Sequence, residues 1–301
     1  MAKQSEQVNS ARRAKHGGIL TAVFAVLSIA WIAPILIVFL NSFKRKAYIF
    51  KYPFSISTKS VFDGFDTWKA GIEKAMCGIL NYKNALKKTD FFNCFGVSLF
   101  ITVGSVLAII ICCSMCAWYI TRVHNMLTKG IYVLCLFSMI VPFQMVMFTL
   151  SKFANILHLA TPWGIIIVYL GFGAGLAVFM FSGFIKSISL EIEEASMIDG
   201  CSPLQTFFQV VFPILKPTTV TIAILEAMWV WNDYLLPSLV LNVNKYRTIP
   251  IAVQYLKQSH GQLDWGAMMA VLVMAIVPII IFYMACQKYI IEGVIAGAVK
   301  G

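Results

Sequence analysis

The sequence has little charge. Asp, Glu, Lys and Arg make up 12% of its 301 residues, whereas a soluble globular domain carries about 25%. Hydrophobic residues make up 59% of the chain, and its mean hydropathy is +0.81. This apolar content excludes an intrinsically disordered protein, and the shortage of charge argues against a water-soluble globule.

The sequence also lacks ten-residue stretches that alternate apolar and polar side chains, the pattern of a transmembrane β-barrel. Instead it contains apolar windows that exceed the roughly 18–20 residues needed for a helix to cross a bilayer. Five windows carry no charge: 17–43, 91–121, 130–151, 153–185 and 265–287. A sixth, 217–243, is interrupted only by Glu226 and Asp233. We therefore predict an all-α membrane protein with six transmembrane helices.

The windows and the intervening polar stretches define the expected organisation of the chain. The first apolar run is too long for a signal-peptide core, so we expect it to remain as a membrane helix. The predicted segments are a polar tail at 1–17, a helix at 18–42, a polar loop at 43–90, a core at 91–288 and a tail at 289–301. Within the core we expect helices at about 91–121, 130–151, 162–185, 217–240 and 266–287.

Neither a metal site nor a disulfide framework is indicated by the eight cysteines. Cys113 and Cys116 form a C-x-x-C pattern, but the pair lies in an apolar span without a second pair or a nearby histidine. Such cysteines are typical small hydrophobic core residues. Cys77 and Cys94 flank one loop, and a disulfide between them is left open. We predict no metal ligands.

The machinery of an enzyme is missing as well. No G-x-x-x-x-G-K-[ST] phosphate-binding loop occurs in the sequence, and no triad of nucleophile, base and acid is arranged for catalysis. The formal net charge of +11 comes from residues in loops beside apolar spans, where charge sets membrane topology. We therefore predict no catalytic residues, no cofactor bound by this chain, contact with lipid, and no nucleic-acid partner.

The basic residues do not settle the orientation. With the N-terminus inside, the inner segments carry fewer Lys and Arg than the outer ones, because residues 43–90 are rich in lysine. Leaving that segment out reverses the comparison. Since a segment of this length lies below the size at which the positive-inside rule fails, the charges favour neither orientation decisively.

The most informative segment is 187–205, which we divide into two short helices. Acidic residues begin the first, at about 189–200, where they suit the positive end of the helix dipole. Gly200 can take the left-handed conformation that ends a helix. Ser202 and Gln205 have the spacing of a capping box for the second helix. The residues alone support either a knob that another protein grips or an interfacial amphipathic helix.

The same segment resembles the EAA-x3-G-x9-I-x-L-P motif of the membrane subunits of type I ABC importers. Three positions depart conservatively from the motif. The matching residues are Glu194, Ala195, Ser196, Gly200, Val210, Phe212 and Pro213. Three other stretches, 41–44, 231–237 and 292–301, are similar to the carbohydrate branch of the family, the maltose-type permease subunit with six helices. The resemblance covers nearly the whole chain.

This resemblance implies the type I ABC importer permease fold, with a cytoplasmic coupling helix between the fourth and fifth spans that docks on an ATPase. The implied ATPase-coupling residues are Glu194, Ala195, Ser196, Asp199, Gly200 and Pro213. Both termini would lie in the cytoplasm of a prokaryotic cell, with residues 43–90 outside the inner membrane. The implied partners are a second, non-identical permease, two ATPase subunits that bind ATP and Mg²⁺, and an extracytoplasmic sugar-binding protein.

Polar residues within spans are candidates for the substrate pathway, because burying them in hydrocarbon is costly. Glu226 and Asp233 are seven residues apart, about two helical turns, and would share one helix face. Trp229 and Asn232 lie close to them, and Gln144 follows Pro142 in another span. Contacts between helices, or with the partner permease, are the alternative that we favour for these residues.

The sequence thus indicates a permease for sugars, with an oligosaccharide as the expected cargo. A permease for another small solute is the alternative. Anionic solutes should require basic residues facing the pathway, and the spans contain almost none. A secondary transporter or a membrane enzyme would need inverted repeats or catalytic groups, which the sequence does not display.

Overall fold

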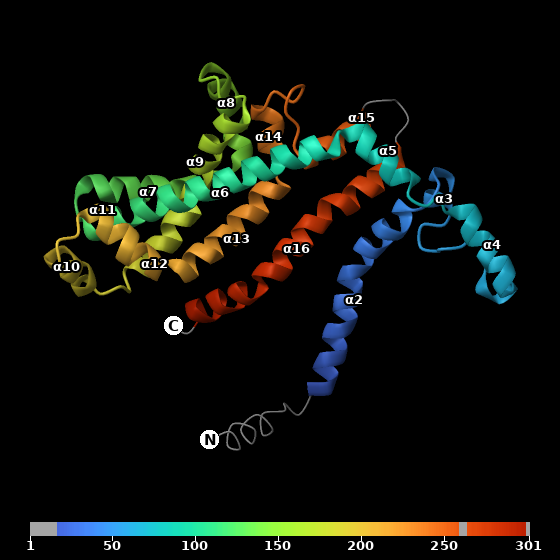
Figure 1. Cartoon of the computed structure of the whole chain (residues 1–301), viewed down its shortest axis with the longest axis horizontal. Coiled ribbons are helices and arrows are strands. Elements are labelled where there is room, and N and C mark those ends of the chain that lie inside the picture. The colour runs from blue at the N-terminus through green and yellow to red at the C-terminus, as the bar shows by residue number, and fades with distance from the viewer. Residues whose placement is uncertain (1–16, 259–263, 299–301) are drawn as a thin grey trace. The chain divides into compact units, whose positions relative to one another are not determined.

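The computed structural model describes residues 17–258 and 264–298 (Figure 1). The regular elements of these residues are helices, and one isolated antiparallel bridge joins Lys44 to Met76. Four helices are long and apolar enough to cross a membrane: α2 (Gly17–Ser42), α6 (Phe91–Arg122), α9 (Pro162–Ile185) and α16 (Trp265–Ala298). Two bent helix pairs raise the number of candidate spans to 6. The all-α fold with up to six spans confirms the prediction.

One bent pair replaces the straight helix that the sequence predicts at 130–151. Helices α7 (Met126–Ile140) and α8 (Phe143–Ile156) meet at an angle of 110°. Pro142 occupies the position just before α8 and has an extended backbone. Because proline lacks an N–H and forces its preceding residue out of the helical region, the chain bends here.

The predicted helix at 217–240 is also divided. It consists of α13 (Lys216–Asn232) and α14 (Leu235–Val240). Asp233 lies at the break, where its Oδ1 accepts hydrogen bonds from the backbone N–H groups of Leu235 (2.9 Å) and Leu236 (3.4 Å). The carboxylate accepts hydrogen bonds from N–H groups that otherwise have no partner at the start of a helix. It therefore stabilises the beginning of α14.

The chain divides into two compact units, of which the first comprises residues 17–85 and 264–273 in the described part. The stretch expected as a polar loop at 43–90 is largely helical. Its elements are α3 (Lys46–Lys51), η1 (Val61–Asp63), α4 (Phe65–Ala75) and α5 (Leu80–Thr89). Long apolar windows do not detect short amphipathic helices, so the sequence did not predict these elements.

A buried lysine holds this unit together just beyond the end of α2. Lys44 has no exposed surface, and its Nζ donates hydrogen bonds to Asn41 Oδ1 and to the Tyr52 carbonyl, both at 2.8 Å. Burial lowers the pKa of Lys44 from its ordinary value. Asn81 Nδ2 donates to the carbonyls of Ser42 and Lys44, also at 2.8 Å. These contacts fix the end of α2 against the beginning of α5.

The two cysteines for which the sequence leaves a disulfide open belong to different units of the chain. Cys77 and Cys94 are free thiols in the structure. Cys77 Sγ donates to the carbonyl of Phe43 (3.3 Å), and Cys94 Sγ donates to the carbonyl of Thr89 (3.2 Å). Each thiol therefore has a local hydrogen-bond partner in its own unit.

The second unit comprises residues 86–258 and 274–298 in the described part, and α9 is its central helix. Helices α6, α7 and α13 all pack on α9. Two glycines of α9 allow close approach, because a side chain at Gly173 would meet Ile109 of α6 and one at Gly175 would meet Met139 of α7. Buried apolar residues of α6 and α9 pack together with residues of the segment before α13. They are Ile109, Cys113, Ala117, Ala177, Phe181, Ile185, Phe207 and Leu215.

Hydrogen bonds join α15 to α6, and α8 to α14. The N–H of Ile249, which begins the unpredicted helix α15 (Ile249–Gln258), donates to Ser98 Oγ of α6 at 2.9 Å. Ser151 Oγ of α8 donates to the Leu239 carbonyl of α14 at 2.7 Å. Helix α16 continues to Ala298, so most of the predicted tail at 289–301 is helical.

Candidate functional site: the coupling loop and the polar residues of α13

Four short helical elements connect α9 to α13: α10, α11, η2 (Phe207–Val211) and α12 (Phe212–Ile214). The first two are the short helices that the sequence predicts. Helix α10 (Leu190–Ile198) begins at Ser189, whose Oγ accepts from the N–H of Glu191. The chain turns two residues after its end, at Gly200, which has φ = +92°. Helix α11 (Pro203–Thr206) begins with a capping box between Ser202 and Gln205. The local sequence therefore fixes both helices and the sharp turn between them.

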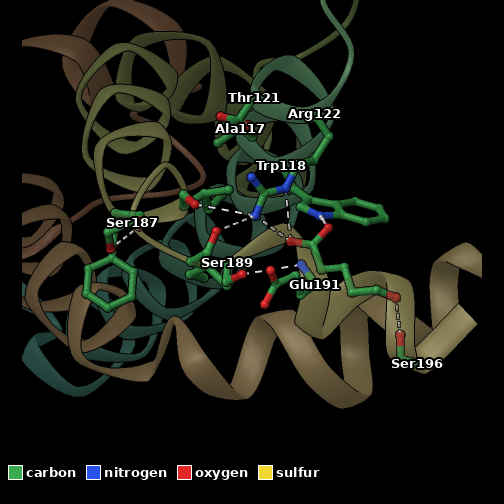
Figure 2. A network of polar contacts seen from close by, with 12 residues as sticks. Ala117, Trp118, Thr121, Arg122, Ser187, Ser189, Glu191 and Ser196 are labelled. Atoms are coloured by element: carbon green, nitrogen blue, oxygen red, sulfur yellow. Dashed lines mark hydrogen bonds and ion pairs between the residues drawn. The ribbon is translucent and has the colours of Figure 1, made fainter.

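A buried carboxylate anchors α10 to the membrane helices. Glu193 is 1% exposed, and its Oε1 accepts from Nη2 (2.6 Å) and Nε (3.0 Å) of Arg122. Its Oε2 accepts from Trp118 Nε1 at 2.9 Å. Figure 2 shows Trp118 and Arg122 projecting together from the last turns of α6 towards α10. The carboxylate thus has three charge-assisted or polar donors, which offsets the cost of its burial.

The arginine also binds the chain just before α10. Its Nη2 donates to the carbonyl of Ile188 at 3.1 Å. This carbonyl follows the end of α9, where the last carbonyl groups of a helix have no partner within the helix. One guanidinium therefore links three elements: α6, the end of α9 and α10.

Ser196 provides a second anchor on the same face of α10. Its Oγ donates to the Glu193 carbonyl (2.8 Å) and lies 3.0 Å from the Thr206 hydroxyl of α11. Both Ser196 and Thr206 are buried. The serine that replaces the alanine of the motif thus joins α10 to α11.

The opposite face of α10 is exposed. Of the predicted coupling residues, Glu194, Ala195, Asp199, Gly200 and Pro213 are exposed, whereas Ser196 is buried. Ile198, with 85% of its surface exposed, adds an apolar side chain beside the carboxylates. Carboxylates and an aliphatic side chain are therefore exposed together on this face of α10.

The sequence predicts that acidic residues begin this helix, but it does not distinguish the buried Glu193 from its exposed neighbours Glu191 and Glu194. Sequence reasoning also missed Arg122 and Trp118, which lie more than 70 positions earlier in the chain. The only available signal is that a basic residue ends a long apolar window. Such a residue is equally expected as a topogenic charge, so the pairing could not be read from the sequence.

The two carboxylates of the fifth predicted span both turn towards α9. Glu226 is 2% exposed, and its Oε2 would lie 3.0 Å from a side chain added at Gly173. Asp233 Oδ2 accepts from the hydroxyl of Tyr169 at 3.0 Å. Since Gly173 and Tyr169 are one turn apart on α9, this arrangement favours the interhelical role.

The other polar candidates are exposed. The ring of Trp229 packs edge-on against Tyr169, with centroids 5.3 Å apart. Asn232 Nδ2 donates to the Met228 carbonyl of its own helix at 2.7 Å. Gln144 lies in the first turn of α8, on a different element. Trp229, Asn232 and Gln144 are therefore free to face a pathway or a partner. Among the described residues, no group of three or more His, Cys, Asp and Glu could hold a metal.

Comparisons with known proteins agree with this arrangement. Residues 110–295 match the family described as binding-protein-dependent transport system inner membrane components. The chain is 38% identical to the probable starch degradation products transport system permease protein AmyC of Thermoanaerobacterium thermosulfurigenes, over 94% of this chain and 96% of that one. It is 33% identical to the multiple sugar-binding transport system permease protein MsmG of Streptococcus mutans, over 89% and 91%.

The fold is similar to a solved one. A chain from the crystal structure of a bacterial ABC transporter involved in the import of the acidic polysaccharide alginate superposes with a TM-score of 0.71, covering 92% of this chain and 98% of that one at 22% identity. This likeness shows that the two chains share a fold. The protein belongs to the family of binding-protein-dependent transport system inner membrane components.

Proposed function

We propose that this permease forms half of the pathway of an ATP-driven sugar importer, with an oligosaccharide as cargo. The named sugars of its relatives support this assignment. They include starch degradation products for AmyC and melibiose, raffinose and stachyose for MelC of Bacillus subtilis, which is 31% identical over 97% of the chain. A radiolabelled-sugar uptake assay in a strain lacking the gene tests the cargo, and uptake of these sugars unchanged by the deletion would exclude it.

Helix α10 is the contact through which the ATPase drives the permease. The observation that carries this proposal is the division of α10 into two faces. One face is clamped by Glu193 to Arg122, and the other exposes Glu194, Ala195 and Asp199. A helix that is held firmly to α6 while presenting carboxylates outward transmits a push from a docked protein to the spans.

The coupling proposal sets the orientation and the partners. Docking on an ATPase places α10 and both termini in the cytoplasm, and residues 43–90 on the outer side of the cell membrane. The assembly comprises this chain, a second and non-identical permease, two ATPase subunits and an extracytoplasmic sugar-binding protein. ATP and Mg²⁺ bind to the ATPase subunits.

The sugar pathway, in this proposal, runs along the exposed side of α13. Trp229 and Asn232 offer an aromatic face and an amide, which suit the apolar faces and hydroxyls of a sugar. Gln144 is a further candidate. Glu226 and Asp233 position α13 against α9 rather than reach the cargo themselves.

Site-directed crosslinking tests the coupling helix. Ala195→Cys lies on the exposed face of α10, and we expect it to crosslink to an ATPase subunit in the assembled transporter. Lys152→Cys, which is exposed like Ala195 but lies on α8, serves as the control. Equal crosslinking at both positions, or at neither, would exclude α10 as the docking contact.

A further inference from the structure

A small cavity with apolar and basic lining residues lies beside the contact of Glu193 with Arg122, where α6 and α9 end and α7 begins. Its volume is about 180 Å³. The end of α6, the beginning of α7 and the end of α9 enclose it, on the same side of the bundle as α10. The lining residues are Ile120, Thr121, His124, Thr128, Lys129, Tyr132, Ser182 and Lys186.

The cavity has basic walls. Lys129, Lys186 and His124 line it, and no Asp or Glu does. Lys186 and Ser182 are four residues apart on α9, so they share one face of that helix. Lys129 and Tyr132 are three apart on α7, and Lys186 Nζ lies 6.0 Å from the centre of the Tyr132 ring. Lysines from the first turn of α7 and from the end of α9 therefore border one space.

A buried hydroxyl in the cavity wall lacks a partner. Ser182 is 1% exposed, and its Oγ has no hydrogen-bond partner among the described residues. The neighbouring hydroxyls behave differently, since Thr121 Oγ1 donates to the Ala117 carbonyl and Thr128 Oγ1 donates to the Val123 carbonyl. An unpaired buried hydroxyl costs free energy unless a ligand or water completes it. The Ser182 hydroxyl can therefore donate a hydrogen bond to a ligand in the cavity.

The donors suit a phosphate group. Two ammonium groups and a hydroxyl, set around a small space, match the several acceptor oxygens and the negative charge of a phosphate. The surroundings indicate where that phosphate comes from. Met126 and Leu127, at the start of α7, are 86% and 63% exposed, and exposed apolar residues continue along α7 at Val133 and Leu134. An acyl chain can lie along this face while its headgroup enters the cavity.

We propose that this cavity binds the phosphate of an anionic phospholipid. Basic pockets between membrane helices are a known way of recognising lipid headgroups. The lipid would occupy the corner between α6, α7 and α9, directly beside Arg122, which holds α10. Its phosphate would accept hydrogen bonds from Lys129, Lys186 and Ser182, and its acyl chains would cover the apolar face of α7.

The lysines could instead only complement the carbonyl groups at the ends of α6 and α9, which carry partial negative charge. That role requires no ligand and no free hydroxyl. The two explanations differ in one measurable property, because only a binding site discriminates between lipids.

Lipid titration followed by native mass spectrometry of the assembled transporter tests the proposal. Phosphatidylglycerol is compared with phosphatidylcholine for the native chain and for Lys129→Gln, Lys186→Gln and Ser182→Ala. Both lysines are exposed, so these variants retain the fold. We expect each lysine variant to weaken phosphatidylglycerol binding about tenfold, the effect of losing one charge-assisted hydrogen bond, and Ser182→Ala to weaken it less.

Lys216→Gln is the matched control. Lys216 is exposed at the start of α13 and lies outside the cavity, so its loss should leave lipid binding unchanged. Equal affinity for the two lipids, or equal affinities in all variants, would overturn the proposal. Inorganic phosphate, added to transporter stripped of anionic lipid, distinguishes the source. Phosphate binding that Lys129→Gln abolishes while phosphatidylglycerol binding persists would assign the cavity to a free anion and overturn the lipid assignment.

Discussion

At the scale of single residues, the buried carboxylate of Glu193 has more influence than the exposed acids around it. It is paired with Arg122 at 2.6 Å and with Trp118 at 2.9 Å. Removing one member of a buried ion pair leaves the other without its partner, which costs about 3–5 kcal/mol when both are fully buried. Arg122 keeps 19% of its side chain exposed, so the cost here should be smaller.

We therefore expect Glu193→Gln to destabilise the permease by about 2 kcal/mol, in line with the loss of a charge-assisted hydrogen bond. A lowered unfolding temperature of the purified complex would report it. Glu194→Gln, next to it in sequence but exposed, is the matched control and should leave stability unchanged while weakening ATPase docking. Equal destabilisation by both variants would show that burial of Glu193 is not what matters.

Gly200 makes a separate contribution through its backbone. Its φ of +92° is rarely adopted by residues with a side chain, although a Cβ at this position would meet no atom within 4 Å. The cost of Gly200→Val is therefore conformational strain of about 1–2 kcal/mol, not a clash.

We expect Gly200→Val to turn α11 away from α10 and to reduce sugar-stimulated ATPase activity of the assembled transporter. Gly183→Val is a suitable control, because Gly183 also has open space around it but lies within α9. Full coupling in a stably assembled Gly200→Val transporter would contradict the proposed role of this turn.

These residues also mark what the sequence could and could not predict. The capping box of Ser202 and Gln205 and the turn at Gly200 depend only on residues a few positions away. The spacing of these residues in the sequence was therefore sufficient to predict both features. The pairing of Glu193 with Arg122 depends on α6 and α10 meeting in three dimensions. A single sequence contains no sign of that meeting, and so the exposed and buried acids of α10 could not be told apart.

At the scale of elements, uninterrupted helices were predicted well and broken ones were not. The predicted spans at 91–121 and 162–185 agree closely with α6 and α9, because both are uniformly apolar and neither contains an internal proline. No charge interrupts the apolar window at Pro142, and the single carboxylate of Asp233 leaves its window apolar on both sides. Hydropathy therefore could not reveal the divisions there. Proline chemistry predicts a bend at Pro142, but its angle of 110° depends on packing against α9 and α14.

Substitutions near the break at Asp233 test which residues of α13 position the helix and which face the cargo. If Asp233 and Glu226 position the helix while Asn232 faces the cargo, Asn232→Ala should alter the KM for sugar transport and leave the complex assembled. Glu226→Gln should change the thermal stability of the complex with little effect on KM. Transport kinetics measured in proteoliposomes, together with unfolding temperatures, separate the two roles. Unchanged kinetics for Asn232→Ala would remove α13 from the pathway.

Tyr169→Phe examines the contact of Asp233 with α9 by itself. The change removes only the hydroxyl that donates to Asp233 Oδ2 at 3.0 Å, and we expect a loss of about 1–2 kcal/mol in stability. Tyr132→Phe is the comparison, since the hydroxyl of Tyr132 makes no contact with Asp233. An unchanged unfolding temperature for Tyr169→Phe would mean that the α9–α13 contact depends on packing alone.

At the scale of the whole molecule, membrane orientation can be measured directly. In a chain without native cysteines, Lys69→Cys on α4 should react with an impermeant maleimide on intact cells. Ala195→Cys on α10 should react only after the membrane is permeabilised. Both positions are exposed, whereas Ser196, the neighbouring motif residue, is too buried to serve. The reverse labelling pattern would place α10 outside and exclude its docking on a cytoplasmic ATPase.

The contacts of Glu193 with Arg122 and Trp118 have a mechanical consequence that follows from the length of α6. This helix has 32 residues and no internal proline, so it extends about 48 Å along an unbroken hydrogen-bond ladder. Arg122 and Trp118 hold α10 at one extremity, and Phe91 stands at the other. A rod of this length tilted by about 5° displaces its far end by about 4 Å. A tilt of α6 that begins at α10 is thus transmitted over the whole length of the helix to its other end.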